Sequence, residues 1–130
     1  KPAMLPLDVK NRAISRSLSR FHDSRIEPLV RSYFDQVTPA YRDQNFIQDN
    51  ARLLKTRFDQ LARMATPAPL LCGNTLSLAD CGFVPTFAIL NRLQPLLEFP
   101  FSSLTASVIT KPRWQNIRRL KMNYKDIMKL

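Results

Sequence analysis

The chain has 130 residues, 45% of them hydrophobic, and its 20 lysines and arginines against 10 acidic residues give a net charge of +10. This length and apolar content suit a single domain with one core. Two cysteines and one histidine are too few for a disulfide framework or a Cys/His zinc site, so we expect no bound metal and a reducing, cytoplasmic setting.

The composition also predicts the fold class. Only two glycines but ten prolines are present, which is typical of helices separated by prolines and unusual for strands joined by tight turns. The most apolar region is interrupted by Pro67, Asp80 and Pro85, which argues against a membrane span. We therefore expect an all-α protein that does not insert into a membrane.

The first predicted helix runs from Asp8, a good N-cap residue, to Val37 without a glycine. Its apolar stripe changes face by about a third of a turn, because each residue advances about 100°. Pro28 lies near the change and predicts a bend there. The two parts of the stripe are Ile14, Leu18 and Phe21, followed by Ile26, Leu29, Val30, Tyr33, Phe34 and Val37.

Two polar features accompany this helix. Ser15, Ser19 and His22 lie on the face that is apolar further along, which suits either ordinary surface or the wall of a cleft. A second row alternates steps of three and four residues and predicts a solvated face with weak ion pairs. This row contains Arg12, Arg16, Arg20, Asp23, Glu27 and Arg31.

A second helix is predicted from about Asp43 to Ala65, because a clear apolar stripe recurs at helical spacing. The stripe consists of Ile47, Ala51, Leu54, Phe58, Leu61, Ala62 and Ala65. Prolines and a glycine then interrupt the chain before Asn74.

A capping box is predicted at Ser77 and Asp80. The Ser77 hydroxyl would accept from the Asp80 N–H while the Asp80 carboxylate accepts from the Ser77 N–H, with Leu76 and Cys81 as the flanking hydrophobic staple. The next helix, Leu78 to about Leu90, is apolar on every side, so we expect it in the centre of a bundle. Such a helix has no amphipathic stripe to define where it starts, and the box supplies that signal.

The cysteines and the C-terminal segment each allow two interpretations. Cys72 and Cys81 are more plausible as small buried hydrophobes with a raised thiol pKa than as a redox pair. A short helix is expected near residues 102–108, and one or two more beyond Pro112. The last stretch, with seven basic residues, Trp114 and Tyr124, suits an amphipathic helix on the bundle better than a nucleic-acid-binding segment.

The stretch "CGNTLSLADCGFVP" resembles the N-capping box and hydrophobic staple in the C-terminal helical domain of cytosolic glutathione transferases. Three other segments agree in order: "MLPLDVKNRA" is similar to the interdomain linker and first helix, "RFHDSRIEP" to the middle of that helix in bacterial members, and "TKPRWQNI" to a later helix. The resemblance implies a bundle of five or six helices. Cys81 departs from it, because the family usually has a larger branched residue there.

The resemblance also implies a division of labour. Residues 1–7 would be the end of an interdomain linker and residues 8–130 the helical domain, while a thioredoxin-like domain ahead of Lys1 would carry the catalytic serine, tyrosine or cysteine and bind glutathione. The intact protein would then transfer glutathione to a hydrophobic electrophile, as a homodimer. No catalytic residue is expected in this chain, but the resemblance places Ser19, His22 and Asp23 near the substrate cleft.

A non-catalytic function of a different class is the alternative. The same type of helical domain serves as an interaction module in translation-associated assemblies, and the charge of +10 suits a protein or RNA partner. However, we find no nucleic-acid-binding motif and no glycine-rich phosphate loop, so a nucleic acid is the less favoured partner.

Overall fold

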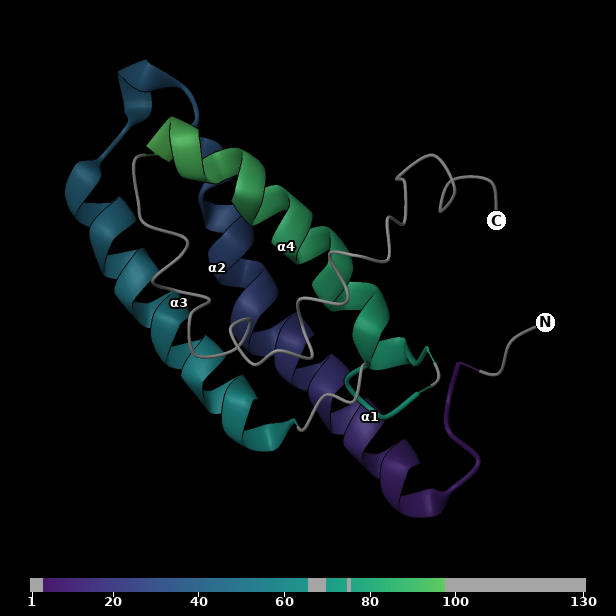
Figure 1. Cartoon of the computed structure of the whole chain (residues 1–130). Helices are drawn as coiled ribbons and strands as arrows, with labels where there is room; N and C mark the ends of the chain where they lie inside the picture. Colours follow the sequence, from purple (N-terminus) through teal and green to yellow (C-terminus); the bar gives the residue numbers. More distant parts are fainter. Residues whose placement is uncertain (1–3, 66–69, 75, 98–130) are drawn as a thin grey trace, which may run out of the picture.

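The computed structural model describes residues 4–65, 70–74 and 76–97, with side chains described as far as Leu93. Within these residues the protein is all-α and contains no β-strand, in agreement with the composition (Figure 1). The helices expected near 102–108 and beyond Pro112 lie outside the described residues. The main elements are α1 (Val9–Phe21), a π-helical turn (His22–Ile26), α2 (Glu27–Ser32), two 3₁₀ turns (Phe34–Gln36 and Pro39–Tyr41), α3 (Gln44–Met64) and α4 (Leu78–Leu97).

The predicted first helix is divided by the π-helical turn. Asp8 caps α1 as expected, since its carboxylate accepts from the Asn11 N–H at 2.8 Å. The bend expected near Pro28 begins earlier, at His22, where the Glu27 N–H bonds the His22 carbonyl. A π-turn holds one more residue than an α-turn, which rotates the faces of α2 by about 100° and accounts for the change of apolar face. Pro28 is the second residue of α2, after Glu27, and has no N–H to donate.

α3 agrees closely with the prediction. Asp43 is the N-cap, and its carboxylate accepts from the N–H groups of Asn45 and Phe46. The predicted stripe is buried except for Ala62, which is partly buried against the core. This confirms the second helix, because its amphipathic spacing leaves little choice of register.

α4 begins at Leu78 as predicted but continues to Leu97, beyond the expected end at Leu90. The expectation that it is buried on every side is wrong. Ala79, Phe83, Thr86, Leu90 and Leu93 form its buried face, whereas Leu78, Cys81, Pro85, Ala88 and Arg92 are exposed. The described helices cover α4 from one side only, so its apolar composition does not translate into uniform burial.

The kinked rod of α1 and α2 lies between α3 and α4, and α4 runs in the same direction as the rod while α3 runs opposite to it (Figure 1). α4 contacts α1, the π-turn and α2 along the rod. Phe58 of α3 stacks on Phe87 of α4 with ring centroids 5.7 Å apart, so α3 and α4 also contact each other directly and share one core with the rod. No helix in the described segments has the length and apolar content needed to cross a membrane.

Candidate functional site

Two buried polar clusters lie along α4, one at its first turn and one in the seam where it packs against the π-turn. The first surrounds Asp80 in the first turn of α4. One carboxylate oxygen accepts from the Ser77 N–H at 2.9 Å and from the Ser77 hydroxyl at 2.8 Å, and the other accepts from the Leu71 N–H at 2.9 Å. Ser77 and Asp80 are both buried. A single carboxylate thus joins the start of α4 to the preceding loop.

This geometry differs from the predicted capping box in one bond. The Asp80 carboxylate does accept from the Ser77 N–H, but the Ser77 hydroxyl donates to that carboxylate instead of accepting from the Asp80 N–H. The Asp80 N–H bonds the Ser77 carbonyl at 3.1 Å. An aspartate is shorter than the usual glutamate, so its carboxylate stays within reach of the serine hydroxyl. Leu76 and Cys81, the predicted staple, are both exposed.

The loop ahead of α4 is closed by Gly73. Its φ of 113° is one that other residues rarely adopt, and Leu70 and Gly73 exchange backbone hydrogen bonds of 2.9 and 3.3 Å. This turn brings the Leu71 N–H to the Asp80 carboxylate. The glycine noted in the sequence is therefore part of the same cluster.

The start of the chain is fastened to the same end of the bundle. The Met4 carbonyl accepts from the Leu78 N–H at 2.8 Å, which satisfies one of the free donors at the start of α4. The Arg12 guanidinium donates to the carbonyls of Pro6 (3.0 Å) and Leu7 (2.6 Å). The segment before α1 is thereby held against both helices.

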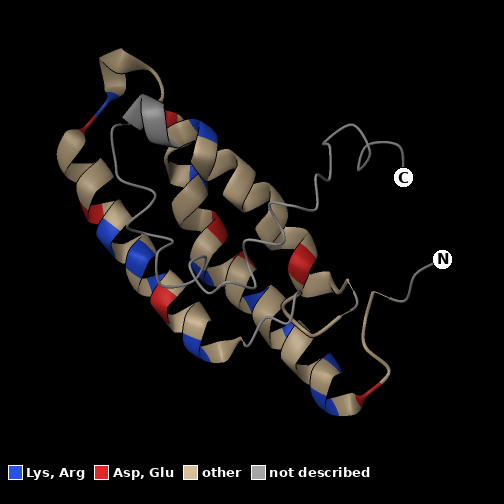
Figure 2. Cartoon of the chain, viewed as in Figure 1, with Lys and Arg blue, Asp and Glu red and all other residues tan. Residues whose placement is uncertain are grey.

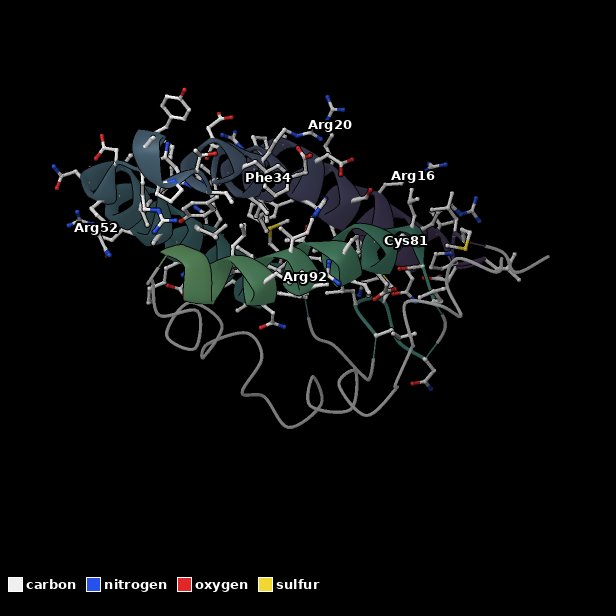
Figure 3. All side chains as sticks on the ribbon, turned by 90° about the horizontal axis from the view of Figure 1, so that it is seen from above. Arg16, Arg20, Phe34, Arg52, Cys81 and Arg92 are labelled. Carbon is white, nitrogen blue, oxygen red and sulfur yellow. The ribbon has the colours of Figure 1, made fainter. Side chains whose placement is uncertain are left out.

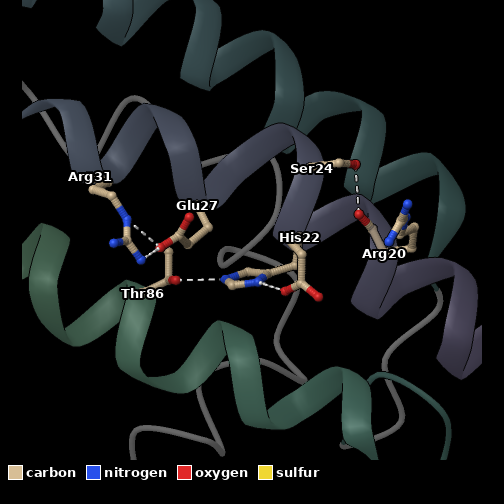
Figure 4. A network of polar contacts seen from close by, with 7 residues as sticks. Arg20, His22, Ser24, Glu27, Arg31 and Thr86 are labelled. Atoms are coloured by element: carbon tan, nitrogen blue, oxygen red, sulfur yellow. Dashed lines mark hydrogen bonds and ion pairs between the residues drawn. The ribbon is translucent and has the colours of Figure 1, made fainter.

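His22 is the centre of the second cluster (Figure 4). It lies where α1 passes into the π-turn, and it is only 5% exposed. Its Nδ1 is 2.9 Å from a carboxylate oxygen of Asp23, and its Nε2 is 2.7 Å from the Thr86 hydroxyl of α4. The imidazole therefore links two elements separated by 64 positions in the chain.

α4 fits closely around this ring. A Cβ atom at Gly82 would lie 2.8 Å from His22 Nδ1, so the absence of a side chain at Gly82 makes room for the imidazole. The Phe83 ring meets it edge-on, with centroids 4.9 Å apart and an interplanar angle of 68°. The ring is thus fixed by packing as well as by hydrogen bonds.

The chemistry of the cluster depends on its hydrogen bonds. A carboxylate only accepts, so the proton on the Asp23 side is carried by Nδ1. Nε2 then accepts from the Thr86 hydroxyl when the ring is neutral. Asp23, His22 and Thr86 are arranged in the order of the acid, base and hydroxyl of a nucleophilic triad. However, Thr86 is only 4% exposed, so a substrate cannot reach its hydroxyl. The side chain of Asp23 is 66% exposed, so the cluster presents a positioned carboxylate at the surface.

The residues that the sequence predicted near a cleft therefore have different environments. His22 is turned into the seam, Asp23 is exposed, and Ser19 is partly buried. Ser15, on the same face of α1, is fully buried, and within the described residues its hydroxyl is the buried side-chain atom without a hydrogen-bond partner.

Cys81 offers no reactive thiolate. Cys81 is exposed, contrary to expectation, because it lies on the side of α4 opposite Ala79 and Phe83. Partial burial and the neighbouring Asp80 carboxylate raise the pKa of its thiol, which keeps it protonated at neutral pH. Among the described residues, no group of histidine, cysteine and acidic side chains could hold a metal ion.

No protein-family model matches the chain, and no curated protein matches it. Sequence reasoning overlooked Thr86, Gly82 and Leu71 as members of the two clusters. Thr86 and Gly82 interrupt an otherwise apolar helix, and this was the signal that could have found them. Leu71 contributes only its backbone N–H, which leaves no trace in the sequence.

Proposed function

We propose that the chain is the C-terminal helical domain of a glutathione transferase-type protein. In the intact protein, a thioredoxin-like domain ahead of Lys1 binds glutathione, and this domain forms the wall of the pocket for a hydrophobic electrophile. The proposal includes a complete bundle of five or six helices and a homodimer. It is supported by the order of the four sequence segments that resemble this family.

The observation that carries the proposal is the Asp80 cluster. The residues with the most specific resemblance, Ser77 to Asp80, lie at the start of a helix that packs on α1, and their polar side chains are buried and bonded. A chance match to a short motif would more often fall on exposed residues without such contacts.

The surface around the start of the chain suits a neighbouring domain. Four large hydrophobic residues near the beginnings of α1 and α4 are exposed, among them Leu7 at 88% and Leu78 at 43%; the others are Val9 and Leu76. Exposed large apolar residues at the start of two helices are compatible with an interaction site there. The Met4 carbonyl accepts from the Leu78 N–H, so Met4 lies at the start of α4, which is compatible with a preceding domain at this end of the bundle.

In this role the domain positions and desolvates the electrophile and transfers no proton. Asp23 and Ser19 supply polar contacts at the rim of the pocket. His22 and Thr86 act through Asp23, because their hydrogen bonds hold its carboxylate in place. They are positioning residues and do not touch the substrate.

The coding sequence upstream of Lys1 tests this proposal first. We expect it to encode a thioredoxin-like domain with a serine, tyrosine or cysteine near its first helix. A different domain at that place, or a start codon immediately before Lys1, would contradict the proposal.

A variant of the intact protein tests the role of Asp23. Asp23→Ala should raise the KM for the electrophile about tenfold, the effect of losing one charged contact of about 1.4 kcal/mol. The matched control is Asp35→Ala, which removes an exposed carboxylate outside the seam and should leave the KM unchanged. Equal KM values for the two variants would show that Asp23 does not contact the electrophile.

A further inference from the structure

The outer face of α1 carries an unbalanced positive charge. Between Val9 and Phe21 the helix contains Lys10, Arg12, Arg16 and Arg20 and no acidic residue (Figure 2). α3 is different, because Arg52 pairs with Asp49 there, and Lys55 pairs with Asp59.

The acidic residues nearest to α1 are already engaged. Asp8 caps the helix, Asp23 bonds His22, and Glu27 pairs with Arg31. In the part of the chain that the structure describes, Arg16 and Arg20 have no ion-pair partner. Both are exposed and project to the same side, away from α4 (Figure 3). Like charges four residues apart on a helix repel each other, so a bound anion would reduce this repulsion.

The three arginines form a regular row. Arg12, Arg16 and Arg20 are spaced by four residues, which corresponds to about 6 Å along the helix axis per step. Each arginine guanidinium can bind one phosphate of a nucleic-acid backbone through two parallel N–H donors. The two carbonyl bonds of Arg12 leave some of its N–H donors free.

The surroundings of the row favour a phosphate backbone over an acidic protein. Protein interfaces centre on aromatic and aliphatic anchors. In the described residues, no large hydrophobic side chain between Val9 and Phe34 is exposed. The exposed neighbours along the row include the small residues Ala13, Ser17 and Ser24, with the carboxylates of Asp8 and Asp23 beyond its two ends. Backbone contacts need no sequence motif, so the absence of a nucleic-acid-binding motif does not bear on this face.

We propose that the row of Arg12, Arg16 and Arg20 on α1 binds the phosphate backbone of single-stranded nucleic acid without sequence preference. This binding goes beyond the proposed role in glutathione transfer, because Arg16 and Arg20 project away from α4 and the seam (Figure 3). Three neutralised phosphates give a slope of about −2 in a plot of log K against log salt.

The test is a fluorescence anisotropy titration of the 130-residue chain with a labelled oligouridine, about 20 nucleotides long so that it spans the row, at several salt concentrations. The variant is Arg16→Gln/Arg20→Gln, and the matched control is Arg52→Gln/Arg63→Gln on α3. All four arginines are exposed, and each pair of changes lowers the net charge from +10 to +8. The basic residues from Lys111 onward are unchanged in both variants, so they contribute equally to each titration.

We expect the α1 variant to bind about 25-fold more weakly at about 0.1 M salt and to lose about 1.4 from the magnitude of the salt slope, as the loss of two phosphate contacts requires. The α3 control should change the affinity less than about threefold. Equal losses in both variants would show that only the net charge matters and would overturn the proposal. Binding of polyglutamate with the same dependence on Arg16 and Arg20 would overturn it too, in favour of an acidic protein partner.

Discussion

Replacing Gly82 with alanine tests the packing of α4 on His22. The added Cβ would lie 2.8 Å from Nδ1 and 3.0 Å from Cε1 of the imidazole. The ring would have to move by about 0.5 Å to restore ordinary contact, and both of its nitrogens are hydrogen-bonded. Overpacking of this kind costs about 1–3 kcal/mol, while alanine gains about 1 kcal/mol over glycine in a helix. We expect a net destabilisation of about 1 kcal/mol.

In a His22→Ala background, Gly82→Ala should change the stability in the opposite direction. Without the imidazole there is no clash, so Gly82→Ala should stabilise the protein by about 1 kcal/mol through helix propensity alone. The two substitutions are therefore coupled by about 2 kcal/mol. The Thr86 hydroxyl loses its partner in both proteins that carry His22→Ala, so this loss cancels in the comparison.

Urea unfolding followed by far-UV circular dichroism measures the effect. With an m-value of about 1.5 kcal/mol/M, Gly82→Ala should lower the midpoint by about 0.7 M in the wild-type background and raise it by a similar amount with His22→Ala. The same midpoint shift in both backgrounds would refute the packing described for the seam.

Three further substitutions are measured by the same assay. Asp80→Ala removes three hydrogen bonds and leaves two buried backbone N–H groups without a partner, so it should lower the stability by about 3 kcal/mol. The exposed control Asp49→Ala should lower it by less than about 0.5 kcal/mol. Equal urea midpoints for the two variants would contradict this. Burial raises the pKa of Tyr33 from 10.0 to about 12, which favours the neutral phenol in the folded state. Stability is then lost as the pH rises from about 10 to 12, and the loss between pH 9 and 11 is about 1.3 kcal/mol. Tyr33→Phe should abolish this part of the loss. The same loss in the variant would contradict the assignment to Tyr33. Ser15→Ala removes an unpaired buried hydroxyl and should raise the stability by about 1 kcal/mol. The exposed control Ser17→Ala reports helix propensity alone and should raise it by less. A midpoint below that of the wild type for Ser15→Ala would show that the hydroxyl has a partner.

The sequence predicted α3 well because its apolar residues recur with one period and its cap, Asp43, stands directly before them. It predicted the start of α4 for a similar reason, since the polar residues Ser77 and Asp80 mark it. These features are local, so their physical cause lies within a few adjacent residues.

The features that the sequence did not predict depend on packing between distant segments. The bond between His22 and Thr86 spans 64 positions, and no local pattern specifies it. The exposed face of α4, including Cys81, was missed because a uniformly apolar helix does not indicate which side is covered. The π-turn was expected only as a bend, since Pro28 marks its end and not its start at His22.

Glutathione conjugation by the intact protein tests the proposed function most directly, with the 130-residue chain as the control. We expect the intact protein to conjugate glutathione to chlorodinitrobenzene and to bind glutathione in calorimetry, and the chain alone to do neither. Micromolar glutathione binding by the chain alone, or the absence of both binding and conjugation in the intact protein, would contradict the proposal.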